Sequence, residues 1–287
     1  MEVEELKITP QENGIGVIVN NHNLSEFLSS DNVSKIQDLL NKYRLIIFQN
    51  QNLTDNQLKE FAHRFGSPFV PDINSPVLGS KDSANAIVIV GNQAHEYTHS
   101  YLGHQEVLPH SDHQWLQRPS AASLLYAVDI QENAAPTIWI DMVQVYNDLE
   151  FETKQAIKDL QLITYNPFHR PFGSVSGKYV DSRIEIPPGE VFEHPLVRTH
   201  PNTHEKILYL NIAYEMEIIG IPYEEGSQLV AKLHNHIISS KYRYEHNWKN
   251  GDLVFWDNRA TLHYRPAFDA TTRRVLKRVT VAGEIPA

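Results

Sequence analysis

Beyond residue 70 the chain repeats one pattern, in which short apolar runs are separated by polar loops that often contain proline. Runs of this length fit β-strands, and several in succession are typical of a β-sandwich or barrel. We therefore expect a mainly β fold with flanking helices. The runs are Ala86–Val90, Ala121–Val128, Thr137–Ile140, Lys206–Ile212, Leu253–Trp256 and Val275–Val281.

Helical patterns precede and interrupt these runs. Asp31 or Asn32 is expected to cap a first helix, whose apolar residues recur at helical spacing. Thr54 and Gln57 have the spacing of a capping box for a second helix, which Gly66 would end. The remaining expected elements are strands over 14–19 and 44–49 and helices over 142–160 and 222–239.

The chain has the length and uniformity of one domain. It contains 287 residues, enough to bury a large core, and we find no repeat, low-complexity tract or linker. We therefore treat residues 1–287 as a single domain. The stretch from Met1 to Pro10 is acidic and lacks the pattern of an export signal, and no apolar run approaches membrane length. A cytoplasmic protein without a membrane partner is expected.

Charge and cysteine content exclude several classes of function. The formal net charge is −10, so the average surface would repel a phosphate backbone and nucleic acid is not an expected partner. The absence of cysteine excludes disulfides, thiolate zinc sites and a cysteine nucleophile. Any bound metal must therefore have nitrogen and oxygen ligands. The sequence leaves open whether the chain forms a homo-oligomer.

A metal-ligand pattern occurs at His110-Ser-Asp112. Alternate residues of an extended segment lie on the same face, so both side chains can reach one ion. Two imidazoles and one carboxylate are the ligand set of non-haem iron oxygenases, in which three coordination positions stay open. The chain contains 15 histidines, so such a pair also arises by chance, and His104-Gln-Glu106 offers the same ligand types. The alternative interpretation of either pair is a solvated loop.

A C-terminal block offers a candidate third ligand and two arginines. The apolar run Leu253–Trp256 leads into a turn, and His263 follows near the start of the next strand. Arg274 stands 11 residues beyond His263, and Arg278 stands 4 residues further on. An even spacing places both arginines on one face of a strand. If that face points inward, the two cations need anionic partners, whereas surface arginines on an edge strand remain the alternative.

Taken together, these motifs resemble those of the TauD/TfdA family of Fe(II)/2-oxoglutarate-dependent dioxygenases. The segment from Tyr43 to Gly66 is similar to the family's strand, helix and Phe-Gly motif. The segment from His194 to Pro201, followed by Ile207 to Asn211, is similar to its middle strand motif. The resemblance covers nearly the whole chain and implies a double-stranded β-helix, the jelly-roll core of cupin-like proteins.

The resemblance also implies roles for individual residues. His110, Asp112 and His263 match the family's iron ligands. Thr137 lies 27 residues after His110, which agrees with the family's spacing for a threonine that helps to hold 2-oxoglutarate and favours His110 over His104 as the ligand. Arg274 matches the arginine that pairs with the distal carboxylate of 2-oxoglutarate, a task suited to a guanidinium group.

The implied reaction consumes 2-oxoglutarate and O2, releases succinate and CO2, and oxidises a C–H bond of the substrate. Halogenating relatives have a small residue in place of the carboxylate, so Asp112 favours hydroxylation, desaturation or a related oxidation. Arg278 matches an arginine that often contacts an anionic group of the substrate. We therefore expect a small, polar substrate that is carboxylate-bearing or amino-acid-like.

The substrate pocket is less well defined by the sequence. A polar, aromatic segment from His95 to His104 suits a lid, although a solvated loop is equally compatible with it. The family's Gly-Gly-Asp before the threonine is replaced by Ala134-Ala135-Pro136, and residues around Pro71 and Asn74 replace the sulfonate pocket of taurine-type members, so we do not expect taurine as the substrate. The candidate substrate-binding residues, besides Arg278, are Tyr101, His104, His113, Trp115 and Arg170.

Two other functions use the same ligands. A zinc hydrolase can bind its metal with two histidines and one carboxylate and keep water at the open position. Such an enzyme has no use for Arg274. A non-catalytic regulator that binds iron or 2-oxoglutarate is the second alternative, but a decayed site would not be expected to retain the three ligands together with Thr137 and Arg274.

Overall fold

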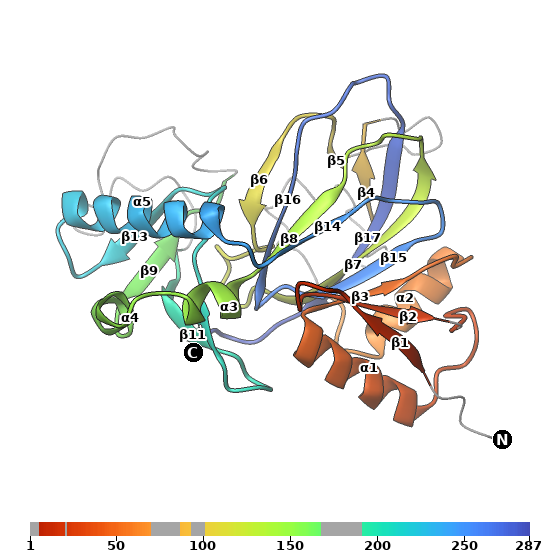
Figure 1. Ribbon diagram of the computed structural model, residues 1–287, viewed down its shortest axis with the longest axis horizontal. Helices are drawn as coiled ribbons and strands as arrows, with labels where there is room; N and C mark the ends of the chain where they lie inside the picture. Colours follow the sequence, from red (N-terminus) through yellow and green to blue (C-terminus); the bar gives the residue numbers. More distant parts are fainter. Residues whose placement is uncertain (1–5, 21, 70–86, 93–100, 168–190) are drawn as a thin grey trace.

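The computed structural model describes residues 6–20, 22–69, 87–92, 101–167 and 191–287. Its centre consists of an eight-stranded and a four-stranded β-sheet, and helices lie outside them (Figure 1). In spatial order, the strands of the larger sheet are β1 (Lys7–Pro10), β2 (Val17–Asn20), β3 (Leu45–Phe48), β15 (Leu253–Asp257), β7 (Ser120–Ile130), β17 (Arg274–Ala282), β4 (Val88–Gly91) and β5 (Tyr101–Leu102). Those of the smaller sheet are β14 (Arg243–His246), β8 (Thr137–Asp141), β16 (Thr261–Arg265) and β6 (Val107–His110).

The two sheets pack against each other through a buried apolar cluster. Trp139 of β8 in the smaller sheet contacts Trp256 of β15 in the larger sheet, with ring centroids 5.6 Å apart. Leu276 of β17 belongs to the same cluster and is fully buried. Because side chains alternate between the faces of a strand, the neighbours of these residues point away from the cluster. This arrangement confirms the expected jelly-roll core.

Helices α1 (Ser30–Tyr43) and α2 (Asp55–His63) cover the outer face of the larger sheet. The capping box of α2 is confirmed, because Thr54 accepts a hydrogen bond from the Gln57 N–H while the Gln57 side chain accepts one from the Thr54 N–H. The expected cap of α1 is wrong. Ser29 caps this helix, and its side chain accepts a hydrogen bond from the Asn32 N–H. The predicted end of α2 at Gly66 is also late, because the last helical residue is His63.

A second group of elements packs around its own apolar cluster beside the smaller sheet. The expected single helix over 142–160 is wrong, since the chain forms two short helices with a turn at Asp148. Asn147 and Asp148 are weak helix formers, which fits the break there. The elements are α3 (Met142–Asn147), α4 (Phe151–Ile157), β9 (Gln161–Thr164), β10 (Glu193–Pro195), β11 (Val197–Thr199), β12 (Lys206–Leu208), β13 (Met216–Ile219) and α5 (Tyr223–Ser239).

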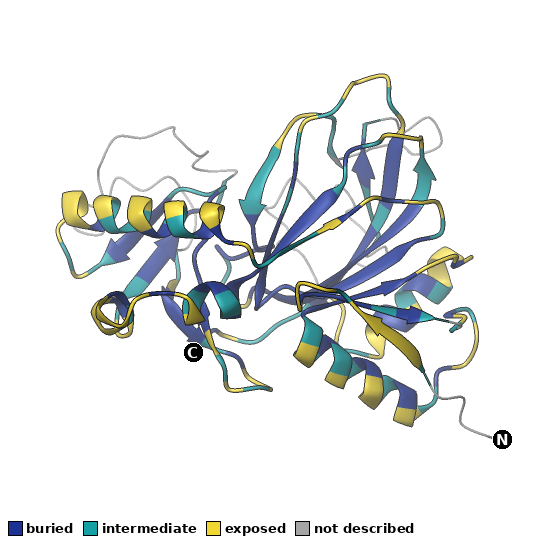
Figure 2. Ribbon diagram, viewed as in Figure 1, coloured by how far each residue is buried: buried dark blue, intermediate teal, exposed yellow. Residues whose placement is uncertain are grey.

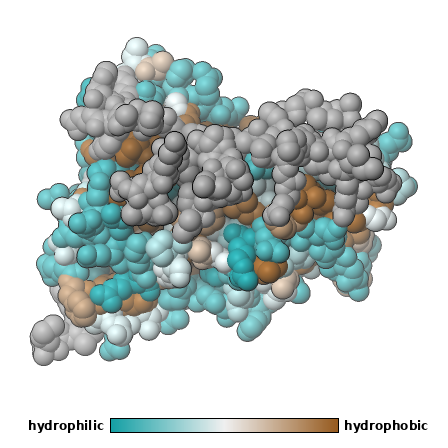
Figure 3. Space-filling view, turned by 180° about the vertical axis from the view of Figure 1, so that it is seen from behind, coloured by the Kyte–Doolittle hydropathy of each residue, from teal (hydrophilic) through white to brown (hydrophobic). Residues whose placement is uncertain are grey.

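Burial follows these layers. Figure 2 shows buried residues concentrated in the strands of both sheets, with exposed residues on the outward faces of α1 and α5. The face drawn in Figure 3 is mostly hydrophilic where the structure describes it, with apolar patches between the hydrophilic regions. None of the described helices has the length and apolar character needed to span a bilayer.

The close approach of β4 to β17 gives a test of the fold. A methyl group added at Gly91 would lie 2.0 Å from the Arg274 carbonyl oxygen, so Gly91→Ala must displace one of the two strands. We expect this substitution to lower the free energy of unfolding by about 1–3 kcal/mol, measured by urea denaturation. Gly226→Ala in α5 is the control, since its methyl group would make an ordinary contact at 3.5 Å and should stabilise the helix by about 0.5–1 kcal/mol. Equal effects of the two substitutions would contradict the close packing of β4 on β17.

Candidate metal centre and active site

His110 and His263 meet because two strands of the smaller sheet pair in register. β6 and β16 are antiparallel, and His110 and His263 are directly opposite each other. Their ring centroids are 4.2 Å apart, and both side chains are buried. Residues that are distant in the sequence are thus brought to one point by the sheet.

Asp112 completes a three-residue cluster. Its Oδ1 lies 3.7 Å from His110 Nε2 and 3.9 Å from His263 Nε2. The potential ligand atoms of the three residues all lie within 4.8 Å of one another. Metal–ligand bonds of about 2.1 Å place adjacent ligand atoms about 3 Å apart, so small side-chain movements would bring these atoms onto one ion, and two histidines with one carboxylate suit Fe(II). The cluster therefore could hold a single metal ion with open coordination positions.

The charges around the cluster favour the metal-binding forms of all three side chains. Burial opposes the ionisation of Asp112, but the Arg278 guanidinium beside it holds the pKa of Asp112 well below the usual range. Arg278 Nη1 lies 3.1 Å from Asp112 Oδ1, and Ser123 donates a hydrogen bond to Asp112 Oδ2. Burial lowers the pKa of His110. Burial and the neighbouring His110 lower the pKa of His263 to about 3. Neutral imidazoles and a carboxylate are the forms that bind a metal.

Asn258 fixes the main chain of Asp112. Its Oδ1 accepts a hydrogen bond from the Asp112 N–H at 3.0 Å, and its Nδ2 donates to the carbonyl oxygens of Asp112 and Ser120, each at 3.0 Å. Ser111 Oγ also donates to the Asn258 carbonyl oxygen. Because Asn258 lies in the turn that leads from β15 to β16, one amide links the segment carrying Asp112 to the strand that carries His263.

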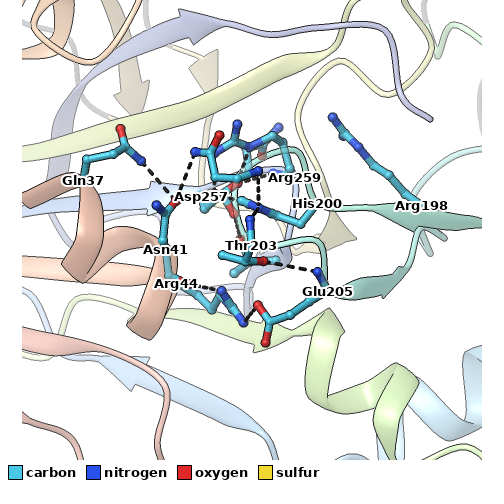
Figure 4. Close-up of polar contacts among 12 residues, drawn as sticks. Gln37, Asn41, Arg44, Arg198, His200, Thr203, Glu205, Asp257 and Arg259 are labelled. Atoms are coloured by element: carbon cyan, nitrogen blue, oxygen red, sulfur yellow. Dashed lines mark hydrogen bonds and ion pairs between the residues drawn. The ribbon is translucent and has the colours of Figure 1, made fainter. Parts of the chain in front are cut away.

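The same turn is fixed on its other side by a buried ionic network (Figure 4). Asp257 accepts two hydrogen bonds from the Arg259 guanidinium and one from His200 Nε2 at 2.8 Å. The other ring nitrogen of His200 accepts hydrogen bonds from the Asn202 and Thr203 N–H groups, so its proton is on Nε2. Despite burial, Arg259 lowers the pKa of Asp257. The turn that the sequence predicts after Trp256 is therefore confirmed, and it comprises residues 258–260.

A cavity beside the cluster contains an excess of positive charge. Its described lining includes three arginines and no carboxylate. Arg274 and Arg278 are both on the inward face of β17, as their spacing predicted, whereas Arg273 is half exposed and pairs with Asp129. The described lining residues are Val90, Leu102, Val107, His110, Leu125, Thr137, Trp256, His263, Tyr264, Arg265, Arg274 and Arg278.

Arg274 is a buried cation that no acidic side chain of the described residues neutralises. Its Nε donates to the Ala135 carbonyl oxygen at 2.9 Å, and its Nη2 donates to Thr137 Oγ1 at 2.8 Å. No carboxylate lies within salt-bridge distance in the described part of the chain. Burial, with a smaller contribution from Arg265, lowers the pKa of Arg274 to about 9. A buried guanidinium of this kind favours an anionic ligand.

The other predicted site residues are placed differently. Glu106 is exposed and His104 half-buried, so the rival pair does not join the cluster. His113 is buried and stacks on Phe69, with ring centroids 4.1 Å apart, while Trp115 is buried against Tyr214. None of His104, His113 and Trp115 belongs to the described lining of the cavity, and their substrate contacts stay predictions.

Other predictions lie where the structure gives no side-chain description. Arg170, Pro71 and Asn74 are outside the described residues, as is most of the segment from His95 to His104. Of Tyr101, only the backbone is described, in β5.

Several functional candidates were missed in the sequence. Ser123, Trp248 and Arg265 have no motif that marks them, although Asn258 lies inside the C-terminal block. Arg265 donates hydrogen bonds from Nη2 to the carbonyl oxygens of Leu102, Gly103 and Gln105, and so fixes one wall of the cavity. Contacts of this kind depend on strand register and cannot be read from spacing.

The jelly-roll fold and a cluster of two histidines and one carboxylate define a class of metal-dependent oxygenases. Residues 6–280 match the model of the taurine catabolism dioxygenase TauD, TfdA family. The chain belongs to this family and is a 2-oxoglutarate-dependent dioxygenase.

Individual relatives support this placement. The chain is 32% identical to an alpha-ketoglutarate-dependent 2,4-dichlorophenoxyacetate dioxygenase of Burkholderia sp. (strain RASC), over 92% of this chain and 90% of the relative. It is 26% identical to an alpha-ketoglutarate-dependent sulfate ester dioxygenase of Pseudomonas putida, over 98% of this chain and 91% of the relative.

Solved structures agree in fold. A taurine dioxygenase from Burkholderia xenovorans matches with a TM-score of 0.79 and 26% identity, over 98% of this chain and 92% of that one. The structure of AAD-2 in complex with Mn(II) and N-oxalylglycine matches with a TM-score of 0.77 and 27% identity, over 99% of both chains.

The hydrogen bonds of Asn258 can be tested by an isosteric change. Asn258→Asp keeps the acceptor for the Asp112 N–H but places a carboxylate oxygen against two carbonyl oxygens. We expect affinity for Fe(II), added without oxygen, to fall about 10- to 100-fold. The measurement is the rise in melting temperature that the metal produces, which should shrink in this variant.

Gln51→Glu is a matched control. The buried Gln51 side chain also accepts one backbone N–H bond, from Leu24, and donates to two carbonyl oxygens, those of His22 and Gln49. Gln51→Glu should lower the melting temperature of the metal-free protein without changing the rise in melting temperature that Fe(II) produces. An unchanged increment in Asn258→Asp would show that Asn258 acts on stability alone.

Proposed function

We propose that this protein is an Fe(II)- and 2-oxoglutarate-dependent oxygenase that oxidises a C–H bond of a small anionic molecule, carboxylate-bearing or amino-acid-like. His110, Asp112 and His263 would hold the iron, and residues 1–287 would act as one catalytic domain. One observation carries the proposal. The possible metal ligands lie in or beside a cavity that two inward arginines also line, and Asp112 is the only carboxylate partner of these arginines among the described residues.

When bound, iron and 2-oxoglutarate supply the oxidising chemistry, which consumes O2 and releases succinate and CO2. The protein supplies ligands, placement and exclusion of water. Arg274 and Thr137 would bind the distal carboxylate of 2-oxoglutarate, since both are buried and already joined by a hydrogen bond. Arg278 keeps Asp112 ionised and so available as a ligand.

The charge of the cavity supports an anionic substrate. Arg265, Arg274 and Arg278 line it, and iron would add further positive charge. A dianionic co-substrate leaves part of this charge uncompensated, and Arg278 Nε is buried without a hydrogen-bond partner among the described residues. Apolar side chains such as Val90, Leu102 and Leu125 suit the carbon skeleton. The names of two relatives, a dichlorophenoxyacetate and a sulfate ester dioxygenase, also describe enzymes of anionic substrates.

The first test is spectroscopic. Adding Fe(II) and 2-oxoglutarate to the metal-free protein under anaerobic conditions should give a visible charge-transfer band that requires both components. His263→Ala removes a ligand and should abolish the band. A protein that gives no band but hydrolyses esters or amides with zinc, independently of O2, would instead be a hydrolase.

The co-substrate site can be tested separately from the metal. Arg274→Ala removes a buried charged donor, so we expect the dissociation constant of 2-oxoglutarate to rise at least about tenfold, while Fe(II) affinity is retained. Arg273→Ala, which removes the neighbouring surface arginine, should leave both affinities unchanged. Unaltered 2-oxoglutarate binding in Arg274→Ala would refute the assignment of this residue.

The substrate class is tested by succinate release. We expect small carboxylates and amino acids to stimulate succinate formation, with product mass spectrometry showing an added oxygen or the loss of two hydrogens. The carboxamide of each active carboxylate is the paired control and should stimulate at least about tenfold less, because it offers no charge to Arg278. Equal stimulation by acid and amide would rule out charge recognition.

A further inference from the structure

The hydroxyl group of Thr137 accepts two hydrogen bonds at once. Arg274 Nη2 donates to its Oγ1 at 2.8 Å, and the indole N–H of Trp248 donates to the same atom at 2.9 Å. A threonine hydroxyl has two lone pairs and one hydrogen. Both lone pairs are therefore engaged, and the hydrogen is the only part of the group still available.

The direction of this hydroxyl hydrogen follows by elimination. Thr137 is buried and lines the cavity. No acceptor for its O–H occurs among the described residues, which leaves an acceptor inside the cavity as its partner. Beside Arg274, an acceptor of this kind would be a carboxylate oxygen.

The Trp248 ring is held so that it cannot easily turn away. Strand β14 places His246 opposite Thr137 on β8, and Trp248 follows just beyond the strand. Asp252 Oδ2 lies 3.0 Å from His246 Nε2 and accepts a hydrogen bond from the Lys249 N–H, so one carboxylate fixes the chain on both sides of Trp248. The His246 ring then packs edge-on against the indole, with centroids 4.6 Å apart.

Neighbouring tryptophans show that packing alone does not create this bond. Trp139 and Trp256 belong to the same buried cluster as Trp248. The indole nitrogens of Trp139 and Trp256 are buried and have no hydrogen-bond partner among the described residues. Of these three rings, Trp248 alone has a described hydrogen bond, and its acceptor is a residue of the cavity.

We propose that Trp248 is a positioning residue for the co-substrate. Its N–H occupies the second lone pair of Thr137, which turns the hydroxyl hydrogen toward the carboxylate bound by Arg274. The anion then receives a hydrogen bond from Thr137 as well as from the guanidinium group. This inference rests on the proposed binding of 2-oxoglutarate at Thr137 and Arg274.

The test compares two tryptophan variants. Trp248→Phe removes the donor, and we expect the dissociation constant of 2-oxoglutarate, read from the anaerobic Fe(II) charge-transfer band, to rise about threefold to tenfold. Fe(II) affinity should not change. Trp139→Phe removes an N–H that has no described partner and should leave the dissociation constant unaltered. The gain in melting temperature on adding 2-oxoglutarate gives a second readout, valid for a destabilised variant.

A double-mutant cycle separates positioning from general damage. Thr137→Val removes the hydroxyl, so adding Trp248→Phe to it should cause no further loss of 2-oxoglutarate affinity. Independent losses in the double variant, or equal losses in Trp248→Phe and Trp139→Phe, would overturn the inference. Absence of 2-oxoglutarate binding by the unaltered protein would instead refute the proposed function.

Discussion

The pairing of β6 with β16 is the constraint on which the site depends. It places His110 opposite His263, although more than half of the chain separates them in the sequence. Asp112 reaches the same point because the chain turns directly after β6 and Asn258 holds both polar groups of its backbone. Since Asn258 belongs to the turn that leads into β16, the segments carrying the three side chains are fixed relative to one another.

The larger sheet adds positive charge. Arg274 and Arg278 of β17 extend into the cavity from the sheet opposite the one that carries the histidines. The spacing of the two arginines along the strand sets how far apart two anionic groups can be bound. Arg278 is partly neutralised by Asp112, whereas Arg274 is hydrogen-bonded only to a carbonyl and a hydroxyl oxygen among the described residues. Burying such a cation costs free energy, which a bound anion recovers. The arrangement of charges in the folded protein therefore favours the binding of anionic ligands.

The sequence predicted a large part of this, because its signals are local. Apolar runs predicted the strands, and the Thr54 capping box predicted the start of α2. The alternation of residues along a strand predicted that Arg274 and Arg278 share one face. The family resemblance then joined His110, Asp112 and His263, which spacing alone could not do. Missed features depend on contacts between distant segments: Trp248 meets Thr137 through the register of β14 on β8, and Arg265 meets the turn after β5. Helix ends were wrong where a neighbouring residue, such as Ser29, offered a better cap.

We propose that two imidazoles, one carboxylate and an inward guanidinium group define a single site for a metal and a dicarboxylate. A crystal structure of the protein prepared without oxygen, with Fe(II) and 2-oxoglutarate and with anomalous data at the iron edge, examines it most directly. We expect one anomalous peak bonded to His110, Asp112 and His263 at about 2.1 Å, with the far carboxylate of 2-oxoglutarate against Arg274 and Thr137. An iron peak elsewhere, or a co-substrate carboxylate that does not contact Arg274, would contradict it.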